Sequence, residues 1–162
     1  MRVYLPATAS DLAAAEISPR TAHAATAALA AVFPEEDQEG LEVSASLCAA
    51  DASLMRLAAP GAETEADRRV VIAADVDDAQ VRQLPVADDV LPGTVEVTAP
   101  VEWGAVAALL VDEAEAEPDV RAARTGDEAA FERAADADLL WYDVSERGAL
   151  AEELAATPRD QH

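Results

Sequence analysis

The segment RVVIAADV, Arg69–Val76, decides the predicted fold. Its run Val70–Ile72 consists of three β-branched residues, which favours a strand that is buried on both faces of a sheet. Carboxylates come at the end of the segment, where Asp75 is followed two residues later by Asp77. We therefore expect a central strand over 69–76 that leads into an acidic turn.

Four other segments are predicted to be strands around this centre. Alternating or continuous apolar residues place them at 2–6, 94–99, 107–112 and 139–144. Seven residues separate the segments 94–99 and 107–112, which is short for a crossover between parallel strands. These two segments are therefore expected to pair with each other as antiparallel strands.

Helices are predicted from apolar spacing and from capping residues. The clearest helix begins near Leu41 and ends before Pro60, because apolar residues recur on one face over its whole length. Ser18 followed by Pro19 is typical of a helix start, so a second helix is expected from there to Phe33. Shorter helices are expected at 8–16, 118–124, 127–135 and 145–154.

The order of these elements predicts an α+β (mixed α/β) fold. A single sheet of about four to five strands is expected, covered by helices chiefly on one face. The first four strands are compatible with a ferredoxin-like core carrying C-terminal additions, although the short link before residue 107 argues against its ordinary topology. With 162 residues, the chain is expected to form one acidic domain over 1–156, followed by a disordered tail at 157–162.

Charge excludes several classes of partner. The chain has 33 acidic and 11 basic side chains and a net charge of −22, and every basic residue is an arginine. Such a charge repels nucleic acids and anionic membranes, so neither is expected as a partner. The acidity is explained by solubility, by adaptation to a salty cytoplasm, or by a basic partner or a cation.

The residue inventory also excludes most familiar active sites. Without lysine there is no Schiff base and no P-loop, and the six glycines are too far apart to cradle a phosphate. His23 and Cys48 do not make a zinc constellation, and they are expected to be a surface or rim histidine and a small core residue. A lone cysteine and the absence of an N-terminal apolar run favour a reducing, cytoplasmic location.

Two groups of residues remain as candidate sites. Carboxylates follow two predicted strands, and if these ends converge they could bind Mg²⁺, Mn²⁺ or Ca²⁺; the alternative is a solvated acidic rim, with no cofactor. The candidate metal ligands are Asp75, Asp77, Asp112 and Glu113. The candidate partner-binding residues are Trp103, Trp141 and Tyr142, since adjacent strand residues point to opposite faces and one ring is then left to a partner; the alternative is that the rings are packed in the core.

Four strings together resemble a known family. They are MRVYLPAT at 1–8, RVVIAADV at 69–76, VDEA at 111–114 and LWY at 140–142. The chain thus resembles an uncharacterised, conserved actinobacterial family, a domain of unknown function, and the resemblance implies a bacterial cytoplasmic protein without supplying an activity. We expect a non-enzymatic interaction or regulatory module with a protein partner; the alternative is a divalent-metal-binding protein or a metal-dependent hydrolase.

Overall fold

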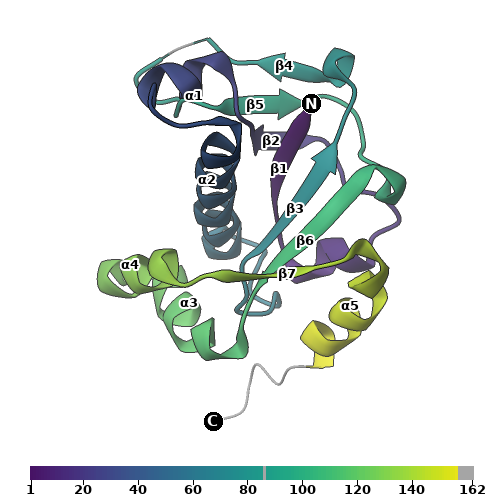
Figure 1. Ribbon diagram of the computed structural model, residues 1–162. Coiled ribbons are helices and arrows are strands. Elements are labelled where there is room, and N and C mark those ends of the chain that lie inside the picture. The colour runs from purple at the N-terminus through teal and green to yellow at the C-terminus, as the bar shows by residue number, and fades with distance from the viewer. Residues whose placement is uncertain (86, 157–162) are drawn as a thin grey trace.

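A single antiparallel sheet runs through the part of the chain that the computed structural model describes, residues 1–85 and 87–156 (Figure 1). Its seven strands lie in the order β4-β5-β2-β1-β3-β6-β7, with β1 and β3 in the middle. The strands are β1 (Arg2–Ala7), β2 (Arg20–His23), β3 (Val70–Asp75), β4 (Val81–Gln83), β5 (Thr94–Val97), β6 (Val106–Asp112) and β7 (Leu139–Tyr142).

Capping side chains start several of the helices. Thr26 accepts the backbone N–H of Leu29 at the start of α1, and Asp37 accepts that of Gly40 at the start of α2. The α-helices are α1 (Ala27–Val32), α2 (Gln38–Ala58), α3 (Glu117–Arg124), α4 (Glu128–Asp136) and α5 (Arg147–Ala156). Short 3₁₀ turns are η1 (Ala9–Ala13), η2 (Asp78–Gln80), η3 (Trp103–Ala105), η4 (Ala114–Ala116) and η5 (Val144–Glu146).

The central strand predicted at 69–76 is confirmed as β3, which lies between β1 and β6. Its residues Val70 to Ala74 are all buried, with alternate side chains entering separate cores on the two faces of the sheet. Ser53 of α2 ties this strand to its neighbour, because its hydroxyl donates to the carbonyl of Ala7 and accepts the N–H of Val70. The middle of the sheet is thus fixed by both apolar burial and a buried hydroxyl.

Helices cover both faces of the sheet. Ala45 and Ala49 of α2 pack on one face, where small side chains let the helix approach β1 and β3. On the other face, Leu12 of η1 and Leu150 of α5 enter the larger core. The expectation that helices cover chiefly one face is therefore wrong. A third cluster joins α2, α3 and α4 beside the sheet.

Two further expectations about the sheet need correction, and a third is not confirmed. It has seven strands rather than four or five, because Arg20–His23 forms β2 where the pattern predicted a helix, and Val81–Gln83 adds β4. The strands β5 and β6 do not pair, since β2, β1 and β3 lie between them. This order does not confirm the ferredoxin-like core.

None of the described helices is both long and apolar enough to cross a bilayer. The predicted tail at 157–162 lies outside the described residues.

Candidate functional site

The strand β7 is an open edge of the sheet that carries large apolar side chains. Among the described residues it pairs only with β6, and it crosses the front of the molecule between α4 and α5 (Figure 1). Its sequence LLWY has no charged residue, glycine or proline. Trp141 is 67% exposed and Leu140 is 39% exposed, whereas Leu139 and Tyr142 are half-buried against the two cores. The outer side of β7 is therefore an uncharged edge of the sheet that carries an exposed tryptophan.

The opposite edge of the sheet is built differently. There, β4 has only three residues, and two of them, Arg82 and Gln83, are exposed polar side chains. A charged side chain on the strand is a common way in which proteins prevent other chains from pairing with an edge strand, and β7 lacks one although it is only four residues long. The sheet thus has one protected edge, and one edge whose strand itself lacks such protection.

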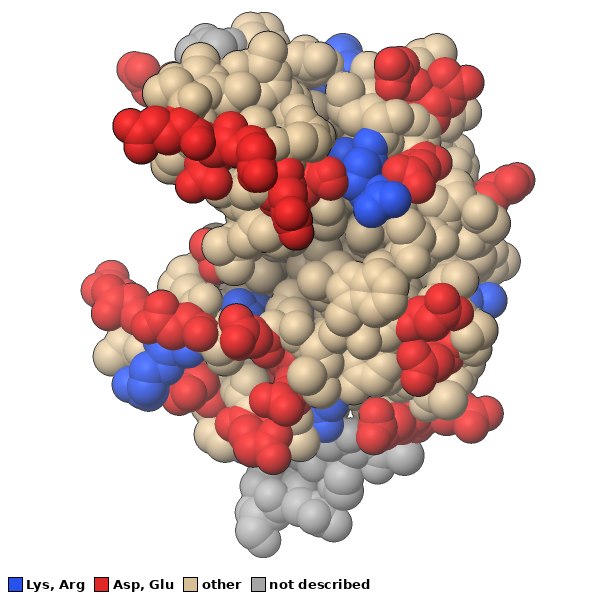
Figure 2. Space-filling model, viewed as in Figure 1, with Lys and Arg blue, Asp and Glu red and all other residues tan. Residues whose placement is uncertain are grey.

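Carboxylates flank the open edge at both ends. Asp138 precedes β7 and Asp143 follows it, and both are exposed. Hydrogen bonding from Ser145, first from its side chain and then from its backbone N–H at 2.9 Å, holds the pKa of the Asp143 carboxyl below the usual range. Figure 2, seen from the same side as Figure 1, shows that the surface over the middle of β7 is uncharged and that acidic side chains lie to either side. The sequence signal for this arrangement is the string DLLWYD at 138–143.

The other predicted partner-binding aromatics are less exposed than Trp141. The indole N–H of Trp103 donates to the carbonyl of Ala14 at 2.9 Å, and the guanidinium of Arg147 lies 4.2 Å from the ring centroid. This cation–π contact and hydrogen bond link η3 to the turn after η1 and to α5. Tyr142 is half-buried against the larger core. Trp141 alone of the three presents most of its ring to solvent.

The four predicted metal ligands do not converge. Because β3 and β6 are antiparallel, Asp75 lies at one end of the pair and Asp112 at the other, where Val70 is opposite Val111. Glu113 follows Asp112 at that second end, so only Asp75 and Asp77 share a pocket, which Glu16 and Glu102 also line. Among the described residues, no three carboxylate, histidine or cysteine side chains are grouped to hold a metal ion.

Asp75 and Asp77 both have partners within the protein. Arg2 donates to both oxygens of Asp75, at 2.7 and 3.0 Å, and holds the pKa of Asp75 below its usual range. Asp77 caps η2 by accepting the N–H of Ala79. The alternative of an Mg²⁺, Mn²⁺ or Ca²⁺ site therefore stays a prediction that no geometric feature favours.

Asp112 is instead half of a buried ion pair. Its carboxylate accepts the side chain of Arg69 through Nε at 2.9 Å and Nη2 at 2.8 Å, and it also accepts the backbone N–H of Arg69. Both side chains are at most 2% exposed. Arg69 also donates to the carbonyl of Ala137, just before β7. The pair thus joins β3 and β6 to the start of the open edge strand.

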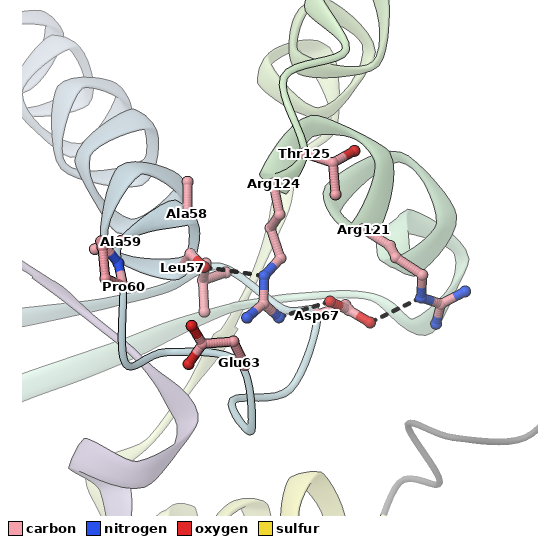
Figure 3. A pocket seen from close by; sticks show the side chains of 9 residues that line it. All are labelled: Leu57, Ala58, Ala59, Pro60, Glu63, Asp67, Arg121, Arg124 and Thr125. Carbon is pink, nitrogen blue, oxygen red and sulfur yellow. Dashed lines mark hydrogen bonds and ion pairs between the residues drawn. The ribbon is translucent and has the colours of Figure 1, made fainter.

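Two arginines of α3 lie beside the end of α2. A pocket of about 470 Å³ is lined there by Arg121 and Arg124 together with Glu63 and Asp67 (Figure 3). Asp67 lies between the two guanidinium groups, and Arg124 also donates to backbone carbonyls, including that of Leu57 (Figure 3). Charges of both signs line this pocket, and both of its arginines are paired with Asp67.

The two remaining candidate chemical groups differ in burial. Cys48 is half-buried and, contrary to expectation, it is not among the core residues of the described chain. His23 is 6% exposed, and its Nδ1 has no hydrogen-bond partner among the described residues. It is therefore a buried histidine rather than the surface or rim residue predicted from helical spacing. Burial raises the pKa of the Cys48 thiol, with a further contribution from Asp51, so the thiolate is disfavoured.

His23 is expected to make stability depend on pH. Burial lowers its pKa, so the folded state keeps it neutral while the unfolded chain binds a proton near pH 6.5. Stability is then lost as pH falls below about 6.5, by at most about 1.4 kcal/mol per pH unit. Urea unfolding at pH 7.5 and 5.5 measures this, and His23→Gln should flatten the difference. An unchanged difference in that variant would assign the pH dependence to other groups.

Comparison with known proteins identifies a family and no activity. A family model described as a family of unknown function (DUF6912) matches residues 1–151. No curated protein and no solved structure matches the chain significantly.

Proposed function

Because the chain belongs to DUF6912, a family of unknown function, we propose its role from its own surface: it is a non-enzymatic interaction module that docks a protein partner on the edge strand β7. One observation carries this proposal. The strand is unpaired along its outer side and uncharged, and Trp141 is 67% exposed on it.

The physical argument starts from what an open edge offers. A strand at the end of a sheet presents unpaired backbone N–H and C=O groups, which can pair with another extended chain. Large apolar side chains add binding energy, and tryptophan is among the residues that contribute most at interfaces. Trp141 and Leu140 point to opposite faces of the sheet, so a docked segment would contact one of them on each face.

The chemistry of the buried groups supports a binding role over catalysis. A general base needs a suitable pKa and an orienting partner, whereas the imidazole Nδ1 of His23 is buried without a hydrogen bond. A nucleophilic cysteine needs a lowered pKa, whereas burial raises that of Cys48. A cytoplasmic location and an actinobacterial origin remain parts of the proposal.

Site-specific crosslinking tests the proposed docking strand. A photoreactive phenylalanine analogue would replace Trp141 in the full chain, and a matched variant would carry it at Met55, which is 63% exposed on α2. Irradiation in a lysate of the source cells should give a discrete adduct from position 141 and none from position 55. Adding Leu140→Arg to the first variant should remove the adduct. Identical adducts from both positions would contradict docking at β7.

A further inference from the structure

The acidic residues at the two ends of β7 indicate which kind of segment fits the open edge. We propose, resting on the docking role of β7, that the partner segment is an extended chain with a basic residue at each end of an uncharged four-residue centre. It adds to the sheet as an eighth strand beside β7. The observation behind this is the placement of Asp138 and Asp143 directly before and after the uncharged strand.

The positions of the two carboxylates define where the basic residues must lie. In an antiparallel pair, residues directly opposite each other are about 5 Å apart at Cβ, and opposite charges at such positions stabilise the pair. Asp138 and Asp143 are five residues apart, so in a continued strand they lie on opposite faces of the sheet. A docked segment therefore meets one carboxylate on each face, and two basic residues at the same spacing are opposite both.

The net charge disfavours pairing of β7 with a second copy of the chain. Each copy carries a net charge of −22, so two copies repel each other. A basic segment meets no such repulsion, and the charge of the molecule therefore favours it over a second copy.

The charge of the surface around β7 also favours a basic segment. On the face that presents β7, the charged side chains are mostly acidic and surround an uncharged middle (Figure 2). A negative field of this kind attracts a basic segment and speeds its encounter, with a strong dependence on salt. Apolar contact with Trp141 and Leu140 then provides the part of the binding that salt does not screen.

Two synthetic peptides test the proposal directly. The probes are the end-capped hexapeptides Arg-Val-Thr-Val-Thr-Arg and Glu-Val-Thr-Val-Thr-Glu, added to the ¹⁵N-labelled full chain. The arginine peptide should shift the amide signals of residues 139–142 and bind about tenfold more tightly than the glutamate peptide. Asp138→Asn should reduce that ratio to about threefold, because one of the two charge contacts is lost.

The possible results separate the two proposals. Equal affinity of both peptides, with the same shifts at 139–142, would overturn the selection for basic residues and leave β7 as a docking strand. If neither peptide shifted these amides, strand addition itself would be overturned. The crosslinking at position 141 tests docking of the natural partner independently of either peptide.

Discussion

Replacing Asp112 with alanine is expected to lower the free energy of unfolding by about 3–5 kcal/mol, as measured by urea denaturation. The carboxylate is fully buried, and it accepts two bonds from the guanidinium of Arg69 and one from the backbone N–H of the same residue. The substitution would leave the charge of Arg69 buried without its counter-ion. That uncompensated charge, rather than the strength of the lost attraction, accounts for most of the expected cost.

Two control variants isolate this cause. Asp119→Ala removes an ion pair with Arg133 that is largely exposed, and should cost at most about 1 kcal/mol. Combining Arg69→Met with Asp112→Leu removes both buried charges together and should recover most of the stability. If Asp112→Ala cost no more than Asp119→Ala, the ion pair would not hold the strands together.

The parts of the fold that were predictable depend on apolar patterns. The central strand β3 follows from a run of β-branched residues, and α2 follows from apolar residues repeated along one face. The apolar residues of β3 are buried in the cores on both faces of the sheet. In α2, Leu41 and Ala45 are buried, but the apolar residues Leu47 and Met55 are exposed. The apolar repeat therefore locates this helix without identifying its whole buried face.

The segment around β2 shows why other parts were not predictable. Alanine is compatible with both a helix and a strand, so Ala22 and Ala24 give little periodic signal, and Ser18-Pro19 favoured a helix start. In the structure, Arg20–His23 is instead the strand β2, which lies between β1 and β5. Pairing with two neighbours outweighs local propensity there, and the order of strands in a sheet has no local signal at all.

Buried charges could not be located from the sequence for a related reason. Arg68 and Arg69 are both buried at the start of the central strand. Arg68 donates to the carbonyl of Asp112 at 3.3 Å, and its Nε lies 3.3 Å from Glu117 in an ion pair too poorly aligned for a hydrogen bond. A charged residue in a sequence is expected at the surface unless its partner is known, and these partners lie more than 40 positions away.

The candidate site could also be predicted only in part from the sequence. Adjacent aromatics on a strand predict that one ring faces solvent, and the structure shows Trp141 exposed and Tyr142 half-buried. That the strand lies at an open edge could not be predicted, because it depends on the order of the strands. The proposed significance of Asp138 and Asp143 follows only from that placement.

Arg124 is expected to be the second large contributor to stability. Its guanidinium donates to Asp67 at 2.7 Å and to the carbonyls of Leu57 and Glu65 at 3.0 and 2.9 Å, and it also reaches the carbonyl of Ala62. It thus ties the loop between α2 and β3 to α3. Arg124→Met keeps an apolar stem of similar length and should cost about 3 kcal/mol in urea unfolding, because a buried carboxylate loses its principal cation.

Arg121 provides the matched control, because it pairs with the other oxygen of the same carboxylate at 2.9 Å but is 57% exposed. Arg121→Met should therefore cost at most about 1 kcal/mol. Hydrogen exchange gives a second measurement: Arg124→Met should speed exchange of amides between residues 61 and 67, and Arg121→Met should not. A larger effect of Arg124→Met is expected because Arg124 is buried and also donates to backbone carbonyls of the loop, whereas Arg121 is largely exposed. Equal effects of the two substitutions would contradict this special role of Arg124.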